Sequence, residues 1–198
     1  NQNELSKNFK NFQNELLKQW EELPPMMITS SKTKVGMKET LDFIIAGAEV
    51  KRYHTVTTLI SETVGHHSHG VAMLCLLFKP DAERELLFAA LCHDLAEHQT
   101  GDIPSPAKRE FGIGGRVDEL EERLMSYVGI HMPHLSTEDK RILKLADIAQ
   151  GAMFCARELS LGNKRIRAIF DRYISYAEEM SLDGRDRQIF NLIKEYGA

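Results

Sequence analysis

The chain has 198 residues, a formal net charge of −4 and a pI near 6.1. This length suits one compact domain, which buries roughly 70% of the surface that its unfolded chain exposes. The charge balance gives no basic field over the whole chain, which argues against a dedicated nucleic-acid binder. No apolar run reaches the roughly 18 to 20 residues that cross a bilayer, and no signal peptide is recognised, so we expect a soluble protein without a membrane partner.

The chain contains three cysteines, Cys75, Cys92 and Cys155. They are odd in number, far apart and set among apolar residues, which is typical of buried thiols in a reducing compartment. We therefore expect a cytoplasmic protein that folds without disulfides.

The first 36 residues are rich in Asn, Gln and Lys, but large apolar residues recur there every three or four positions, as on one face of an amphipathic helix. The residues of this face are Leu5, Phe9, Phe12, Leu16 and Trp20. Pro24 and Pro25 end the predicted helix, and a polar run from Thr29 to Gly36 follows as a linker. This helical extension either packs on its own domain, which its apolar face favours, or contacts an oligomer or another partner.

From Met37 onward the helical period dominates, and the alternation typical of strands is scarce. The first predicted helix presents one apolar face, made of Leu41, Ile44, Ile45 and Ala48. Further helical patterns cover residues 71–78, 80–98, 117 onward, 136–159, 166–180 and 185–196, with a long loop at 104–115 and a helix cap at 136–139. Residues 37–198 are thus predicted to form a single all-α bundle.

The strongest local signal lies near the end of the apolar pattern at 80–98. It reads Cys92-His93-Asp94-Leu95-Ala96-Glu97-His98. Adjacent positions on a helix point about 100° apart, so His93 and Asp94 can both lean toward one atom, while Glu97 shares a face with His93. This arrangement is typical of a metal-ligand pair with a carboxylate beside it, although His followed by Asp also occurs by chance in surface pairs.

Two other segments offer further metal ligands. Three imidazoles, those of His66, His67 and His69, lie at the start of a second apolar helix, and neutral imidazole nitrogen suits a transition metal. Asp147 is a lone carboxylate among apolar neighbours, where an ionised group is costly to bury unless it is paired or coordinated. Two histidines and two carboxylates would leave coordination positions open for water and substrate.

The pattern of these motifs resembles the HD phosphohydrolase superfamily, and more closely its bacterial 5'-deoxynucleotidase branch, which includes similar phage dATP triphosphohydrolases. The matching segments are Arg52-Tyr53, Glu62 to Ser68, His93 to Glu97, and Thr100-Gly101-Asp102-Ile103-Pro104-Ser105-Pro106-Ala107-Lys108. The resemblance covers roughly residues 37–174 and implies an HD domain at 37–198, with residues 1–36 outside it. One departure is His66, because the family commonly has Glu at the position before the ligand.

The resemblance implies one divalent metal, Co, Mn, Zn or Mg, held by His67, His93, Asp94 and Asp147. Glu97 is not a ligand by this analogy, and we expect it to orient or deprotonate the attacking water, with a structural salt bridge as the alternative. Asp102 either supports the water or leaving group, or caps the loop that begins at Gly101.

The phosphate-binding candidates are Arg52 and Lys108, since a guanidinium can hold two phosphate oxygens and an ammonium acts as a point charge. Lys51 and Arg109, beside them, either favour a longer phosphate chain or are merely solvated. Tyr53 either stacks on the base or ribose, or is a half-buried core tyrosine.

The implied function is hydrolysis of a 2'-deoxynucleotide, with a purine expected. Either dATP gives deoxyadenosine and triphosphate, or a monophosphate gives nucleoside and phosphate. The alternatives are hydrolysis of another nucleotide phosphate ester and a non-catalytic nucleotide-binding module. The resemblance also leads us to expect a homo-oligomer with a small-molecule substrate, located in the host cytoplasm if the protein is encoded by a phage.

Overall fold

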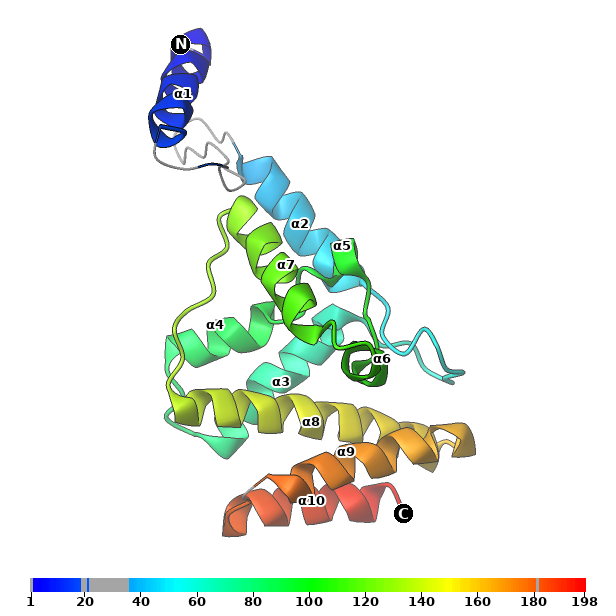
Figure 1. Ribbon diagram of the computed structural model, residues 1–198. Coiled ribbons are helices and arrows are strands. Elements are labelled where there is room, and N and C mark those ends of the chain that lie inside the picture. The colour runs from blue at the N-terminus through cyan, green and yellow to red at the C-terminus, as the bar shows by residue number, and fades with distance from the viewer. Residues whose placement is uncertain (1, 19–20, 22–35, 181) are drawn as a thin grey trace.

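The computed structural model describes residues 2–18, 21, 36–180 and 182–198 (Figure 1). Within these residues the chain is helical, and its β-structure is a single isolated bridge between Lys51 and Thr63. The elements are α1 (Gln2–Leu16), α2 (Met37–Glu49), α3 (Val64–Phe78), α4 (Arg84–Cys92), α5 (Glu97–Thr100), α6 (Ser105–Glu110), α7 (Gly114–Tyr127), α8 (Thr137–Ser160), η1 (Lys164–Ile166), α9 (Arg167–Glu179) and α10 (Gly184–Tyr196). The predicted all-α class is confirmed.

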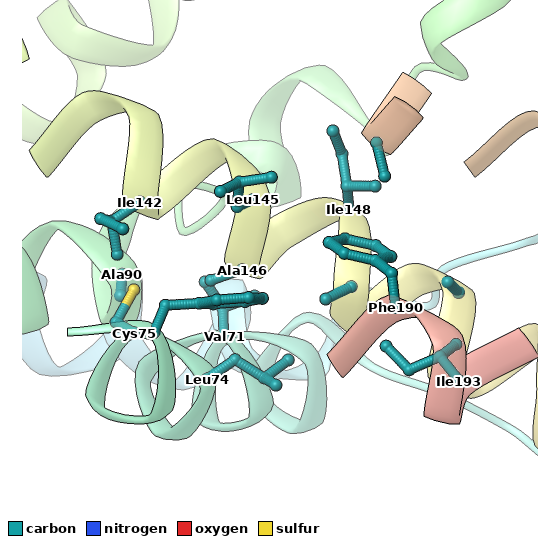
Figure 2. Packing of buried hydrophobic residues seen from close by; sticks show 14 of the residues in the cluster. Val71, Leu74, Cys75, Ala90, Ile142, Leu145, Ala146, Ile148, Phe190 and Ile193 are labelled. Atoms are coloured by element: carbon teal, nitrogen blue, oxygen red, sulfur yellow. The ribbon is translucent and has the colours of Figure 1, made fainter. Parts of the chain in front are cut away.

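The long helix α8 is the centre of the bundle. It packs against α3 and α4 on one side and against α9 and α10 on the other. Small residues such as Ala146, Ala149 and Ala152 are fully buried along it, which lets the neighbouring helices approach closely. Figure 2 shows the result, with side chains of α3, α8 and α10 meeting in the main hydrophobic core.

The start of α8 has the predicted cap. The Ser136 hydroxyl accepts a hydrogen bond from the backbone N–H of Asp139 at 3.0 Å, which satisfies one of the free amide groups of the first turn.

A second, smaller core joins α2, α5 and α7, and it shows that the apolar face predicted for the first helix is wrong. Leu41, Ile44 and Ile45 are 54%, 43% and 58% exposed, whereas Phe43 and Gly47 are buried. A Cβ atom at Gly47 would lie only 2.3 Å from the carbonyl oxygen of Leu95. Close backbone approach at this glycine therefore decides which face of α2 turns inward.

The predicted helix over residues 80–98 is instead two shorter helices, α4 and α5, separated by a turn at residues 93–96. In that turn the N–H of Leu95 donates to the carbonyl of Cys92, and the N–H of Glu97 to that of Asp94, so bonds of the i to i−3 type replace the α-helical ones. The predicted loop at 104–115 likewise contains α6, with Pro106 in its first turn. The His93-Asp94 pair therefore lies in a tight turn.

The predicted N-terminal helix is present as α1. Phe12 on its apolar face is 55% exposed, and Figure 1 shows α1 apart from the helices of the bundle, so the expected packing on its own domain is not observed among the described residues. The predicted helix end at Trp20, Pro24 and Pro25 and the linker at 29–35 lie outside those residues. None of the described helices is both long and apolar enough to cross a membrane.

Candidate metal centre

The four predicted metal ligands converge from three places in the fold. His67 is fully buried in the first turn of α3, His93 and Asp94 lie in the turn after α4, and Asp147 projects from the middle of α8. The Nε2 atom of His67 lies 3.2 Å from Nε2 of His93, 3.4 Å from Oδ1 of Asp147 and 3.5 Å from Oδ2 of Asp94. The contacts between α3, α4 and α8 thus bring distant donors to one point.

The spacing of these donor atoms fits a metal ion. Bonds of about 2.0–2.2 Å place neighbouring donors of a tetrahedral or octahedral site about 3–3.6 Å apart. His67, His93 and Asp147 each offer an atom within 4.8 Å of the others. Asp94 touches both histidines, at 3.5 Å from each Nε2, and its Oδ2 also accepts a hydrogen bond from Arg52 at 2.7 Å. The donor set therefore suits a divalent transition metal.

Both imidazoles are held in the orientation that a metal requires. The Nδ1 of His93 lies 2.9 Å from the backbone carbonyl of Ala90, and the Nδ1 of His67 bonds the side-chain oxygen of Gln150. Because both partners are acceptors, each Nδ1 carries the proton and each Nε2 keeps its lone pair for the shared point. His66 and His69, the alternatives to His67, are exposed.

The two carboxylates are ionised in spite of their burial. Burial raises the pKa of Asp147, but the neighbouring imidazole of His67 and the charge of Lys144 outweigh it and hold that pKa well below the usual value. The pKa of Asp94 is lowered as well, because His93 and Arg52 outweigh its desolvation. Anionic oxygens therefore face the two imidazole nitrogens.

The pKa of Glu97 is shifted in the opposite direction, upward. It is 4% exposed, and its Oε2 atom has no hydrogen-bond partner among the described residues. Burial, together with repulsion from Asp94 and Asp102, raises the pKa of Glu97 to about 9. A buried carboxyl group with a raised pKa beside metal-ligand candidates is a candidate for proton transfer.

Arg52, Tyr53 and Asp102 form one wall of the site. The guanidinium of Arg52 bonds Asp94, and its Nε lies 3.5 Å from Glu62, so part of this cation is engaged by protein carboxylates. Tyr53 has a left-handed backbone with φ 56°, and its N–H donates to Asp102 at 3.3 Å. Asp102 thus accepts from the backbone of the Arg52-Tyr53 segment. The sequence had suggested that it caps the loop beginning at Gly101.

The ring of Tyr53 is largely committed to protein contacts. It stacks on Phe154 with a centroid distance of 4.5 Å, and its hydroxyl lies 3.2 Å from that of Tyr173. This corresponds to the half-buried tyrosine among the two expectations, although Tyr53 still lines the pocket.

The metal-ligand candidates His93, Asp94 and Asp147 lie on the wall of a cavity of about 1470 Å³. Arg52, Lys108 and Arg109 line it as well, whereas Lys51 is not among its lining residues. The structure adds three basic residues from α8 and α9 that sequence reasoning missed: Lys140, Lys144 and Arg172. Lys140 and Lys144 precede Asp147 at helical spacing, a signal that was present in the sequence.

Two buried acids were given no role from the sequence. Glu62 is 7% exposed and accepts from Gln150 at 2.7 Å; burial raises its pKa, and Gln150 and Arg52 oppose that rise. Glu158 is fully buried and accepts from the backbone N–H groups of Leu59 and Ile60. Both acids hold the loop that carries Arg52 and Tyr53.

Comparison with known proteins relates the middle of the chain to the HD domain. A family model described as the HD domain matches residues 49–145. A 5'-deoxynucleotidase of Klebsiella pneumoniae is 28% identical over 141 residues, which cover 58% of this chain and 69% of that protein. A separate short similarity, 50% over 40 residues and 20% of each chain, relates part of the chain to the probable GTP-binding protein EngB of Porphyromonas gingivalis.

Two solved structures share the fold at 20% identity. The PH0347 protein from Pyrococcus horikoshii matches with a TM-score of 0.61 over 81% of this chain and 98% of its own. The HD phosphohydrolase DatZ of cyanophage S-2L, bound to dA and one catalytic Zn²⁺ ion, matches with a TM-score of 0.55 over 86% of this chain and 99% of its own. The family model thus identifies an HD domain at residues 49–145, and the two solved structures share the fold of the chain.

Proposed function

We propose that this protein is a metal-dependent phosphohydrolase of 2'-deoxynucleotides with a preference for a purine base. The observation that carries the proposal is the meeting of His67, His93 and Asp147 within 4.8 Å near the buried Glu97, whose Oε2 has no hydrogen-bond partner among the described residues. The deoxynucleotide substrate is inferred from the relatives, one of which is a 5'-deoxynucleotidase and another a phosphohydrolase bound to dA.

His67, His93, Asp94 and Asp147 would hold the metal. When bound, a divalent ion supplies Lewis acidity toward a phosphoryl oxygen and toward water. Burial and the neighbouring Asp94 and Asp102 raise the pKa of Glu97 to about 9, and a bound cation would oppose that rise. Glu97 then orients the attacking water and accepts its proton.

The cations of the cavity would hold the phosphate. Lys108 and Arg52 lie on its wall, and Lys140, Lys144 and Arg172 extend the basic lining along α8 and α9. Lys144 is 60% exposed although it pairs with Asp147 at 2.8 Å, so its ammonium keeps contact with solvent. Acidic residues also line this cavity, but its volume of about 1470 Å³ and the cations beyond the metal ligands favour a triphosphate over a monophosphate.

The test is a product analysis. Purified protein is incubated with each deoxynucleoside mono- and triphosphate in the presence of Co²⁺, Mn²⁺, Zn²⁺ or Mg²⁺, and the products are separated by ion-exchange chromatography. We expect deoxyadenosine and triphosphate from dATP. If orthophosphate were released from dAMP and no product were formed from dATP, the protein would be a monophosphate hydrolase and the triphosphate activity would be rejected.

Two further outcomes would reject the substrate class. Turnover of a different nucleotide phosphate ester with no turnover of deoxynucleotides would indicate another hydrolase on the same centre. Tight nucleotide binding without hydrolysis under any of the four metals would indicate a non-catalytic binding module.

A further inference from the structure

The Nδ1 atoms of the two histidine ligand candidates are held in different ways. His93 bonds a backbone carbonyl, that of Ala90, which no substitution at position 90 removes. His67 bonds the side chain of Gln150, which projects from α8 one turn after Asp147. The orientation of His67 therefore depends on a replaceable side chain.

Gln150 is itself held on two sides. Its Nε2 donates to Oε1 of Glu62 at 2.7 Å, while its Oε1 faces Nδ1 of His67. Glu62 lies 3.5 Å from Arg52, and Arg52 bonds Asp94 at 2.7 Å. A continuous chain of polar contacts thus connects one ligand candidate, His67, with another, Asp94.

The direction of the amide follows from these partners. A carboxylate beside a guanidinium offers acceptors, so the amide nitrogen turns to Glu62 and the amide oxygen to His67. An oxygen at that place requires a proton on Nδ1 of His67, and the lone pair then lies on Nε2, which faces His93 and Asp147. The opposite amide orientation would set two acceptors against each other at Glu62.

The neighbouring helix leaves room for this side chain. A Cβ atom at Gly70, one turn after His67 on α3, would lie 2.8 Å from Cγ of Gln150. The contact is with the middle of the Gln150 side chain, which is held at its far end by two hydrogen bonds. The glycine is therefore required by the position of Gln150.

We propose that Gln150 is the positioning residue of the metal centre: together with Glu62 it fixes the tautomer and ring orientation of His67, so that Nε2 is presented to the metal. The proposal rests on the metal site of the proposed function, and it concerns a residue that acts only through His67. Partners of this kind contribute about 10–100-fold to metal affinity in other proteins.

The first test determines which ring nitrogen of His67 carries the proton, in the full chain freed of metal. Long-range ¹H–¹⁵N correlation spectra of the imidazoles distinguish a proton on Nδ1 from one on Nε2. We expect His67 of the wild type to carry it on Nδ1, and Gln150→Met, which keeps the volume and removes the acceptor, to give a mixture or the other tautomer. Gln188→Met on the exposed side of α10 is the control and leaves His67 unchanged.

The second test measures Zn²⁺ and Co²⁺ affinity by calorimetry. Gln150→Met is expected to bind about 10–100-fold more weakly. Gly70→Ala, which removes no polar group, should weaken binding in the same direction by displacing Gln150. Thermal unfolding monitored by circular dichroism identifies any variant that has lost its fold.

A double substitution separates positioning from a loss of packing. In Glu62→Gln with Gln150→Glu, the donor and acceptor exchange places, so a carboxylate faces His67 and an amide faces that carboxylate. We expect this variant to recover the Nδ1 proton of His67 and most of the metal affinity that Gln150→Met loses. Recovery would not follow if Gln150 only filled space.

The outcomes distinguish this inference from the proposed function. An unchanged His67 tautomer and unchanged metal affinity in Gln150→Met would overturn the positioning role while leaving the metal centre intact. A wild type that binds no divalent metal, with a tautomer that still depends on Gln150, would support the contact and overturn the metal-dependent function.

Discussion

The carboxyl group of Glu97 lies where burial and two neighbouring carboxylates all oppose its ionisation. Its raised pKa of about 9 describes a site without positive charge at the centre, and such a group is protonated at neutral pH. The role assigned to Glu97 therefore depends on the charge that the neighbouring ligands hold. Its function and the metal site can be tested separately because the assigned ligands are His67, His93, Asp94 and Asp147, and Glu97 is not one of them.

Glu97→Gln should keep the metal and lose most of the hydrolysis rate. The amide preserves the shape but cannot accept a proton, and general-base assistance is typically about 10²–10⁴-fold. The measurements are metal content by elemental analysis and initial rates with dATP. In contrast, Asp94→Ala should lose both metal and activity; if Glu97→Gln retained the wild-type rate, the carboxyl group would have only a structural role.

At the scale of elements, the loop between α2 and α3 contributes five residues to the pocket wall and is hydrogen-bonded to the end of α8. The carboxylate of Glu158 accepts from the backbone of Leu59 and Ile60, and from the side chain of Asn163 at 2.6 Å. Burial raises the pKa of Glu158, but these hydrogen bonds outweigh it and lower the pKa below its usual value. The ionised form therefore stabilises the loop.

Glu158→Gln should lower the free energy of unfolding by about 2–3 kcal/mol at pH 7, because hydrogen bonds to a buried charge are lost and one amide hydrogen faces backbone donors. A group with a lowered folded pKa stabilises above its unfolded pKa and loses that effect as pH falls through the folded value. The difference in the free energy of unfolding between Glu158→Gln and the wild type should therefore become smaller below about pH 4.5. Urea unfolding from pH 3.5 to 8 measures it.

The control for this change is Glu195→Gln on the exposed side of α10, which should alter stability by less than about 0.5 kcal/mol. A difference for Glu158→Gln that stayed constant down to pH 3.5 would mean that packing, and not the charge, accounts for it.

The contact between α8 and α9 also depends on a glycine. A Cβ atom at Gly151 would lie 2.4 Å from Cζ of Tyr173, whose hydroxyl meets Tyr53. Gly151→Ala should therefore destabilise the fold by about 1–3 kcal/mol through overpacking, although alanine favours a helix by about 0.5–1 kcal/mol. Moving Tyr173 should also raise KM for the nucleotide, which steady-state kinetics would show.

Gly184→Ala is the matched control, since a Cβ atom at Gly184 would meet nothing within 4 Å. It should leave both the melting temperature and KM close to wild type. Equal effects of the two alanines would contradict the steric argument at Gly151.

At the scale of the whole molecule, the all-α class could be predicted because the helical period is a local property of the sequence. The ligand candidates could be named because His93-Asp94 and the His67 segment are short motifs. The inward face of α2 could not, because it is decided by Leu95, about fifty residues away, at a glycine that carries no apolar signal. Gln150 was missed for the same reason, as its partners His67 and Glu62 lie 83 and 88 residues away.

The metal centre joins α3, α4 and α8, so its occupancy should stabilise the entire bundle. A ligand that binds only the folded chain contributes about 2.7 kcal/mol at 100 times its dissociation constant. For a chain of this length that corresponds to a rise of about 5–10 °C in melting temperature. Adding Zn²⁺ or Co²⁺ to metal-free protein should give this rise in a calorimetric scan, and EDTA should reverse it. Asp147→Ala, which removes one donor and leaves the helix contacts of α8 in place, should show little or no response. A rise of equal size in that variant would place the bound metal elsewhere on the chain and contradict the assignment of Asp147 as a ligand.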